Sequence, residues 1–341
     1  MAARRGDTLL FPTPPIVAAH AAIGGKKEGE GPLAACFDAL SADNFFGQSS
    51  WEAAEKELAL QTARLCLKKA QTTPEKVSLV LAGDLQAQCT ASSYAMRELG
   101  IPFAGLFGAC STMAEALGLG AALCSAGMAD GLLAMTSSHF CAAERQFRTP
   151  LSYGAVRTPT AQWTATAAGA CLLRPAGEGV QLCAVTFGRV QDYKIKDINN
   201  MGAAMAPAAA ATLLRYLKDT GSAPEDFDRI YTGDLGHVGS QLLRDLLAAE
   251  GLLLKNHVDC GCILYDATEQ TVKSGGSGPG CSASVLCGHI LPRLEKGTQK
   301  RVLFIATGAL MSQTTFLQKE SIPAIAHLVE LRSPQQKEEN G

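Results

Sequence analysis

The stretch LCLKKAQTTPEKVSLVLAGDL (Leu65–Leu85) decides the fold, because the chain repeats its pattern without gaps 150 residues later. The second copy reads RYLKDTGSAPEDFDRIYTGDL (Arg215–Leu235), with the same Pro-Glu pair and the same final Gly-Asp-Leu. Each copy predicts an amphipathic helix, a short turn opened by Pro-Glu, and an apolar strand that runs into Gly-Asp. A match over 21 positions indicates an internal duplication.

The repeat continues on the C-terminal side of this stretch. Gly-Ala-Cys-Ser at Gly108–Ser111 corresponds to Pro-Gly-Cys-Ser at Pro279–Ser282, and a buried strand predicted at Leu132–Thr136 corresponds to Val302–Ala306. The spacing between copies grows from 150 to 171 residues, which places an insertion of about 20 residues in the second copy, around Leu247–Glu269. Apolar strands that alternate with helices predict parallel sheets covered by helices on both faces.

We therefore predict an α/β protein built of two duplicated halves, residues 1–185 and 186–335, related by a pseudo-twofold axis in αβαβα layers. Residues 336–341 are expected to form a frayed tail. The 341 residues, 47% of them hydrophobic and 18% charged, are enough to bury a large core. A single ligand cleft is expected where the two halves meet.

Composition excludes several classes of function. The net charge of −2, with both signs scattered, gives no basic stripe and therefore predicts no nucleic-acid partner. We find neither an export signal nor an apolar run of the ~20 residues that a membrane span requires, and expect synthesis in the cytoplasm. The 12 cysteines are then expected to be free thiols. Cys260 and Cys262 form a lone Cys-x-Cys without a second ligand pair, so neither a metal nor a cofactor is predicted.

Cys110 is the residue best placed for chemistry. It lies in Phe107–Met113, after an apolar strand and before a helix rich in small residues, so its thiol is expected at a strand-to-helix elbow. The free N–H groups of a helix N-terminus lower the pKa of a thiol and attract anions. Ser111 supplies a further donor there, whereas Cys281, at the same place in the second copy, is interpreted as a buried packing residue.

The Gly-Ala-Cys-Ser elbow in the first of two α/β halves resembles the nucleophile elbow of the thiolase and β-ketoacyl synthase superfamily. Four further blocks resemble the stage V sporulation protein AD family: GGKKEGEGPL (Gly24–Leu33), FFGQSSWEAAE (Phe45–Glu55), SSHFCAAERQFRTPLSYG (Ser137–Gly154) and RTPTAQWTATAAGA (Arg157–Ala170). The resemblance implies a thiolase fold and the binding of dipicolinic acid, for its uptake into the developing spore. It also implies a homodimer that works beside membrane subunits of the same operon, peripherally at the forespore inner membrane.

Two departures from the superfamily pattern bear on catalysis, which needs a thiolate, one or two partners from the second half and an oxyanion hole. His237 follows a second-half strand and could face Cys110 as a base. The second partner normally comes from a Gly-His-Pro or Gly-Asn motif, but here Ser274–Gly280 reads SGGSGPG, and the thiolase Cys-x-Gly-Gly-Gly turn is replaced by Ala306–Leu310. Because a general acid/base is missing, we predict a protein of this fold that is not an enzyme.

Dipicolinate is a flat aromatic dianion, so its burial requires fixed donors or cations and an apolar wall. The residues predicted to bind it are Cys110, Ser111, His139, Arg145, Arg148, Arg157, Gln162, Trp163 and His237. Each arginine could equally be ion-paired, and His139 and Trp163 could be structural. Asp84 and Asp234 occupy equivalent positions in the two copies, which favours a structural role for both. Whether calcium accompanies the ligand is open.

Two other functions fit the same residues. A β-ketoacyl-synthase-like acyltransferase would use Cys110 as nucleophile and His237 as base, and acyl-coenzyme A would then leave an acyl group on the cysteine. An architectural subunit, for example a plug on a membrane channel, would carry the same pocket as a vestige. The absence of dipicolinate binding would favour this architectural function.

Overall fold

The computed structural model describes residues 2–147 and 157–334. Its main path of strands runs in the order β12-β11-β14-β15-β10-β3-β9-β7-β5-β6. One arm of this path consists of β3 (Ile16–Gly24), β9 (Ala167–Arg174), β7 (Leu132–Ser138), β5 (Leu79–Gly83) and β6 (Phe103–Gly105). The other arm consists of β10 (Val180–Thr186), β15 (Ala324–Arg332), β14 (Arg301–Ala309), β11 (Arg229–Thr232) and β12 (His257–Asp259).

The two arms have the same plan when they are followed outward from the antiparallel contact between β3 and β10. In each arm the first two pairings are antiparallel and the last two are parallel. This agreement is the structural form of the duplication in the sequence. The division predicted between residues 185 and 186 stays a prediction. Strand β10 runs across that position and holds the place in its arm that β3 holds in the other.

The prediction of purely parallel sheets was wrong for part of each arm. Strands β9 and β15 run antiparallel to both of their neighbours. Each follows a connection that carries a short helix, α5 (Phe140–Phe147) or α11 (Gln313–Leu317), and re-enters the sheet beside the strand that has just ended. Because β9 and β15 are buried almost throughout, their apolar runs gave no sign of direction.

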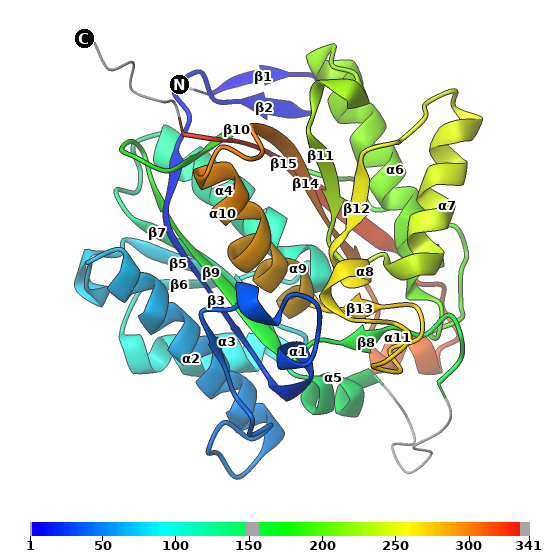
Figure 1. The fold of residues 1–341 in the computed structure, drawn as a ribbon, viewed down its shortest axis with the longest axis horizontal. Coiled ribbons are helices and arrows are strands. Elements are labelled where there is room, and N and C mark those ends of the chain that lie inside the picture. The colour runs from blue at the N-terminus through cyan, green and yellow to red at the C-terminus, as the bar shows by residue number, and fades with distance from the viewer. Residues whose placement is uncertain (1, 148–156, 335–341) are drawn as a thin grey trace.

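Helices cover the two arms in layers (Figure 1). On the outer face of the first arm lie α2 (Trp51–Lys69) and α3 (Thr90–Leu99), and on that of the second arm lie α6 (Met201–Thr220) and α7 (Gly236–Ala249). Between the arms lie α4 (Thr112–Ser125) and α9 (Pro279–Val285). Helix α4 contacts strands of both arms, whereas α9 contacts β3, β7 and β9 of the first arm and reaches Gly233, just after β11, through the thiol of Cys281. The largest apolar cluster surrounds these two central helices. The layering is the predicted αβαβα arrangement.

Short elements complete the described chain. They are β1 (Ala3–Arg5), β2 (Thr8–Leu10), α1 (Lys26–Gly29), β4 (Ala39–Leu40), β8 (Trp163–Thr164), α8 (Cys260–Leu264), β13 (Gly276–Ser277) and α10 (Leu291–Glu295). The second-half insertion lies at residues 260–278, between β12 and α9, because the first half needs only residues 106–108 to pass from β6 to its elbow. This is later than predicted. Its strand β13 pairs with β8 of the first half. The predicted tail, residues 336–341, lies outside the described residues.

Candidate functional site

Cys110 lies at the predicted elbow, in a single 3-10 turn (Ala109–Ser111) between β6 and α4. Ala109 has a φ of 50°, a left-handed conformation that is strained for any residue with a Cβ. The thiol that follows is 8% exposed. Ser111 is fully buried and its hydroxyl donates to the carbonyl of Gly108 at 2.6 Å, so it supports the turn and is not among the residues that line the cavity beside Cys110.

Gly308 on β14 brings the second half against this elbow. A Cβ at this position would lie 2.3 Å from the carbonyl oxygen of Gly108, so a larger residue would force the two halves apart. Gly308 belongs to Ala306–Leu310, the block that stands in place of the thiolase glycine-rich turn. The block therefore still serves close packing at the elbow.

The group beside Cys110 is the carboxylate of Asp234, which lies at the end of β11 and is fully buried. It accepts hydrogen bonds from the Ser277 hydroxyl at 2.9 Å, from the Gly278 N–H at 3.0 Å and from the Thr307 hydroxyl at 2.8 Å. Burial raises the pKa of this carboxyl against the opposing effect of those hydrogen bonds. Burial, and next the negative charge of Asp234, raise the pKa of the Cys110 thiol well above its usual value. At neutral pH the sulfur is therefore a thiol.

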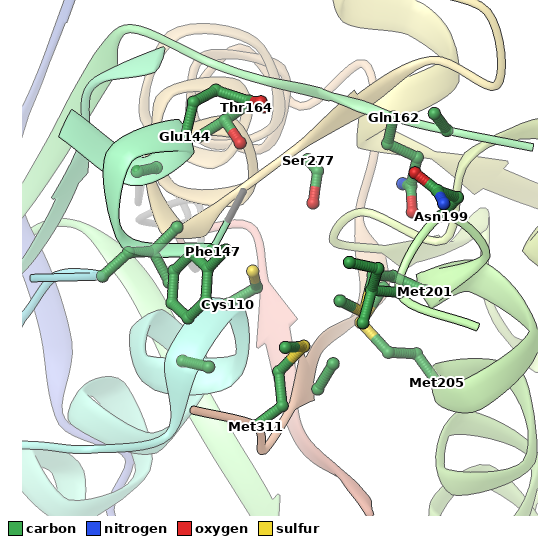
Figure 2. Close-up of a pocket in the computed structure, with 16 residues that line it drawn as sticks. Cys110, Glu144, Phe147, Gln162, Thr164, Asn199, Met201, Met205, Ser277 and Met311 are labelled. Atoms are coloured by element: carbon green, nitrogen blue, oxygen red, sulfur yellow. The ribbon is translucent and has the colours of Figure 1, made fainter. Parts of the chain in front are cut away.

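A cavity of about 160 Å³ opens beside Cys110, and we call it the cysteine pocket. Figure 2 shows the sulfur of Cys110 pointing into it, with Phe147 on one side, Met311 below, and Met201 and Met205 opposite. The lining is Leu85, Ala109, Cys110, Ala143, Glu144, Phe147, Ala161, Gln162, Thr164, Ile198, Asn199, Met201, Met205, Ser277, Ala309 and Met311. Methionine and phenylalanine side chains give an apolar wall that can adapt to a flat ring.

Gln162 is the best-fixed polar group of the cysteine pocket. Its amide nitrogen donates to the carbonyl oxygens of Asp234 at 2.6 Å and Gly276 at 2.9 Å, which ties the first half to the second. Both N–H bonds are then used, and the amide oxygen is buried without a hydrogen-bond partner among the described residues. A bound molecule that donates a hydrogen bond would satisfy this oxygen.

His237 does not face Cys110, although the sequence predicted it as the partner. It lies exposed in the first turn of α7, and its backbone N–H donates to the carbonyl of Ser274. The chain turns sharply at Gly236, with a φ of 64°, so the residue that reaches the cysteine is Asp234, three positions earlier. Both residues follow the same strand in the sequence, and the choice of the histidine over the aspartate was wrong.

His139 and Trp163 line a different cavity, on the other side of β8. His139 is buried, its ring Nε2 lies 2.8 Å from the carbonyl oxygen of Asn44, and burial lowers its pKa. Trp163 stacks on Phe140 with ring centroids 3.8 Å apart. The single predicted site is therefore divided between two cavities, with Cys110 in one and these two residues in the other.

Arg157 is fixed at the wall between the two cavities. Its guanidinium forms an ion pair with Glu144 at 2.5 Å and donates to the carbonyl of Gln162 at 2.6 Å. It also lies over the rings of Phe140 and Trp163, at 5.1 and 4.9 Å from their centroids. Arg157 is therefore ion-paired, which was the alternative to ligand binding. Its contacts help to position Glu144 and Gln162 in one cavity and Trp163 in the other.

Arg145 points away from the cysteine pocket. Its side chain is 49% exposed, pairs with Glu52 at 3.0 Å and lies over the ring of Trp51. Arg148 lies outside the described residues. Among the described lining residues of the cysteine pocket the only charged side chain is that of Glu144, so the predicted cluster of cations is not assembled there.

Several residues that line the cysteine pocket could not be recognised from sequence patterns. Asp234 was noticed only as one of a matched pair, and Asn199 follows an irregular stretch without a motif. Phe147, Met201 and Met311 come from three separate elements, so no local pattern connects them. Asp234 could have been found by asking which titratable side chain stands first after the strand, since only Gly233 separates it from β11.

Neither a metal site nor a membrane-spanning helix is evident in the described ranges. Within residues 2–147 and 157–334 there is no group of three or more His, Cys, Asp or Glu side chains arranged to hold a metal ion. Over the same ranges none of the helices combines the length and the apolar character needed to cross a membrane.

A cysteine at a strand-to-helix elbow, in a cleft between two arms with one strand plan, defines the thiolase class of fold, and solved structures agree. The 3-oxoacyl-[acyl-carrier-protein] synthase III of Aquifex aeolicus aligns with a TM-score of 0.57 at 13% identity, over 93% of this chain and 99% of that one. OleA of Xanthomonas campestris aligns with a TM-score of 0.60 at 16% identity, over 97% of this chain and 99% of that one. At such identities the likeness concerns the fold alone.

The particular family follows from sequence comparison. The profile of the stage V sporulation protein AD family matches residues 5–332. Stage V sporulation protein AD of Bacillus subtilis (strain 168) is 42% identical over 322 residues, which cover 94% of this chain and 95% of that protein. The chain belongs to the stage V sporulation protein AD family.

Proposed function

We propose that this protein binds dipicolinic acid without chemical turnover, as a subunit of a complex that carries the acid into the developing spore. One observation carries the non-catalytic part: the carboxylate of Asp234 stands beside Cys110. Acyl transfer begins with a thiolate, which a nearby cation or base stabilises. A buried negative charge acts in the opposite direction and raises the pKa of the thiol. Membership of the sporulation family supports the setting.

The cysteine pocket offers suitable groups for the ligand. Phe147 and the methionines supply apolar surface for the pyridine ring, while the Asn199 amide and the Thr164 hydroxyl line the same space and can donate to a carboxylate. Among the described lining residues the only charged side chain is that of Glu144, and its carboxylate is already paired with Arg157. Since a free dianion would be buried there without a cation, we expect the neutral calcium chelate to bind more tightly than dipicolinate alone.

Calorimetric titration tests this proposal. The wild-type protein is titrated with dipicolinate, and then with its calcium chelate, and both are expected to bind with one ligand per chain. Cys110→Ala should keep the melting temperature but weaken binding roughly tenfold, because it changes the floor of the pocket. Cys124→Ala, a buried cysteine at the far end of α4, is the matched control and should bind as the wild type does.

The contrary outcomes are distinct. If neither ligand binds at millimolar concentration, the protein is an architectural subunit. If Cys110→Ala binds as tightly as Cys124→Ala, the ligand lies elsewhere in the molecule. If the free acid binds more tightly than the chelate, the electrostatic argument for calcium is wrong while the binding function stands.

The second part of the proposal concerns partners. We expect a homodimer in which the β6 strands of two copies pair, because β6 ends the strand path, and no other strand of residues 2–147 and 157–334 pairs with its outer edge. Tyr94 and Phe107 flank this edge and are 51% and 69% exposed. Sedimentation should give a dimer, and Phe107→Glu should shift it toward monomer. A wild-type monomer at micromolar concentration would contradict this.

The complex itself is expected at the forespore inner membrane, beside membrane-embedded subunits of the same operon. This part rests on the family alone. Co-purification of the tagged protein with those subunits from sporulating cells is the measurement. Recovery of the protein only in the unattached fraction would count against this location.

A further inference from the structure

A second cavity, which we call the lysine pocket, lies across the wall formed by α5 and β8. Its volume is about 260 Å³, and its lining is Lys26, Lys27, Glu28, Glu30, Asn44, His139, Phe140, Cys141, Trp163 and Thr166. Because side chains alternate along an extended strand, Gln162 and Thr164 point into the cysteine pocket while Trp163 points into this one. The lysine pocket is therefore a separate space, and the proposed dipicolinate site does not use it.

The ammonium group of Lys27 dominates the interior of the lysine pocket. It donates to the carbonyl oxygen of Gln270 at 2.6 Å and lies 4.5 Å from the centre of the Trp163 ring. An ammonium has three N–H donors, and only one of them has a hydrogen-bond acceptor among the described residues. Burial, as the largest effect, lowers the pKa of Lys27, although the nearby carboxylates of Glu30 and Glu28 act in the opposite direction. Lys26 is exposed beside it and has no ion-pair partner in residues 2–147 or 157–334.

The acidic residues of the lysine pocket, Glu28 and Glu30, do not accept hydrogen bonds from the two lysine ammonium groups. The Glu28 carboxylate is fully buried and accepts from the N–H groups of Gly25 and Thr166 and from the hydroxyl of Tyr265. Burial raises its pKa against the opposing effect of these hydrogen bonds. These contacts anchor the short helix α1, which carries both lysines, to Thr166 and Tyr265. Glu30 is exposed at the rim.

Two neutral donors complete the lining. The Thr166 hydroxyl oxygen accepts from the backbone N–H of Phe140 at 3.1 Å, which leaves its own proton free to donate into the cavity. The Asn44 side chain is exposed at the mouth, and its amide has no protein partner in the described chain. The lysine pocket is thus bordered by hydrogen-bond donors without acceptors in the part of the chain that the structure describes, from Lys26, Lys27, Asn44 and Thr166. A bound molecule with acceptor oxygens would satisfy them.

We propose that the lysine pocket binds a small oxyanion, a carboxylate or a phosphate group, between the ammonium groups of Lys26 and Lys27. The oxygens of such a group accept charge-assisted hydrogen bonds from both lysines and a neutral one from Thr166. The inference does not depend on dipicolinate binding, because it concerns other residues and a separate cavity.

Trp163 provides the signal for a direct test. The chain has only two tryptophans, so Trp51→Phe leaves Trp163 as the sole indole, with Lys27 over its ring. Titration of this protein with inorganic phosphate, and separately with malonate, should give a saturable change in fluorescence. The anion with the larger affinity identifies whether the natural ligand carries a phosphate or a carboxylate.

Variants of three lysines decide the interpretation. Lys27→Gln, in the Trp51→Phe background, should weaken anion binding roughly tenfold or more, because it removes a charge-assisted hydrogen bond. Lys26 is exposed, so Lys26→Gln should leave the fold intact, and it should weaken anion binding several-fold. Lys76→Gln, an exposed lysine on a different turn, is the control and should change nothing. Absence of a saturable signal with both anions, or equal affinities in the Lys26→Gln and Lys76→Gln proteins, overturns the proposal.

The same proteins separate this inference from the proposed function. Dipicolinate titrated calorimetrically into Lys27→Gln should bind as it does to the wild type if it occupies the cysteine pocket. If Lys27→Gln abolishes dipicolinate binding, the oxyanion of the lysine pocket is dipicolinate itself, and the placement of that ligand beside Cys110 is wrong. Loss of anion binding with dipicolinate binding intact supports both proposals.

Discussion

The triplets Gly83–Leu85 and Gly233–Leu235 are identical in sequence and equivalent in the two arms, yet their side chains have different surroundings. Asp84 turns toward its own arm and accepts from the N–H of Gln86 and from the N–H and hydroxyl of Ser92, which fixes the start of α3. Asp234 turns toward the seam between the arms, where it meets Cys110. Leu85 lines the cysteine pocket, whereas Leu235 is fully buried in the core.

The difference teaches that duplication fixes where a residue lies and that its neighbours decide what it does. The first arm provides Asp84 with a nearby helix to cap. The second arm has the insertion at residues 260–278, whose strand β13 brings Ser277 to Asp234 at 2.9 Å. A structural function, predicted for both aspartates, fits the contacts of Asp84. Asp234 also forms structural hydrogen bonds, but it additionally sets the charge beside the only cysteine that lines the cysteine pocket in the described chain.

The largest expected effect comes from removing each carboxylate. Asp234→Ala leaves the hydroxyls of Ser277 and Thr307 and the Gly278 N–H buried without an acceptor, and should lower the free energy of unfolding by about 3–4 kcal/mol. Asp84→Ala should cost about 2 kcal/mol, because its loss also relieves repulsion of another buried carboxyl. Urea unfolding of both proteins gives the comparison, and equal losses would show that the two positions are energetically alike.

An effect of comparable size, confined to a pH range, is expected from that second carboxyl, Glu55, on α2. Burial, followed by the charge of Asp84, raises its pKa to about 8. The folded protein therefore keeps a proton that the unfolded chain releases near pH 4.5, so this residue makes the fold less stable as pH rises from about 4.5 to about 8, and adds no further change above that. The difference in the free energy of unfolding between Glu55→Gln and wild type should move in favour of the variant by a few kcal/mol over this range.

The matched control for this pH dependence is Glu57→Gln, on the same helix, where the carboxylate is half-buried, contacts Lys56 and accepts from the side chain of Gln61. Its unfolding free energy should follow that of the wild type at each pH. If Glu55→Gln also follows the wild type between pH 5 and 8, the carboxyl is not held protonated in the folded state.

The next effect concerns the reactivity of Cys110. Replacing the neighbouring carboxylate by a neutral amide in Asp234→Asn should lower the pKa of the thiol and speed its alkylation by iodoacetamide roughly tenfold, since one pKa unit is a tenfold change in thiolate. Peptide mapping by mass spectrometry follows Cys110 separately from the other cysteines. An unchanged rate would mean that burial alone protects the sulfur.

The smallest effect is expected with acyl-coenzyme A. Incubation of the wild-type protein should leave its intact mass unchanged, because burial and the neighbouring Asp234 carboxylate keep the thiol of Cys110 protonated. Cys110→Ala serves as the blank. An acyl adduct on the wild type that is absent from the variant would establish the acyltransferase alternative and contradict the non-catalytic proposal.

The fold was predictable because its evidence is local and repeated. Leu65–Leu85 and its copy each contain a helix, a turn and a strand in sequence, and the repeat then implied equivalent arms. The direction of β9 was not predictable, since an apolar strand buried on both faces reads alike in either direction. The elbow was found for the same reason as the arms: strand, small residues and helix are adjacent in the chain around Cys110.

The site was only partly predictable because its residues converge from distant elements. Cys110 and Gln162 do line the same pocket, but His139 and Trp163 face the opposite side of the wall. A motif fixes the order of residues and cannot show which side of a two-residue strand each one faces. The choice between Asp234 and His237 depended on one left-handed glycine, Gly236, which turns the chain after the aspartate.

The strand β8 is only two residues long, and its pairing with β13 joins Trp163 to Gly276 and Thr164 to Ser277. The register of this pairing decides which residues of the wall face the cysteine pocket and which face the lysine pocket. A shift of one residue in this register would place the ring of Trp163 in the cysteine pocket and the amide of Gln162 in the lysine pocket. The groups that line both pockets thus depend on the alignment of β8 with β13, two short strands from opposite halves of the molecule.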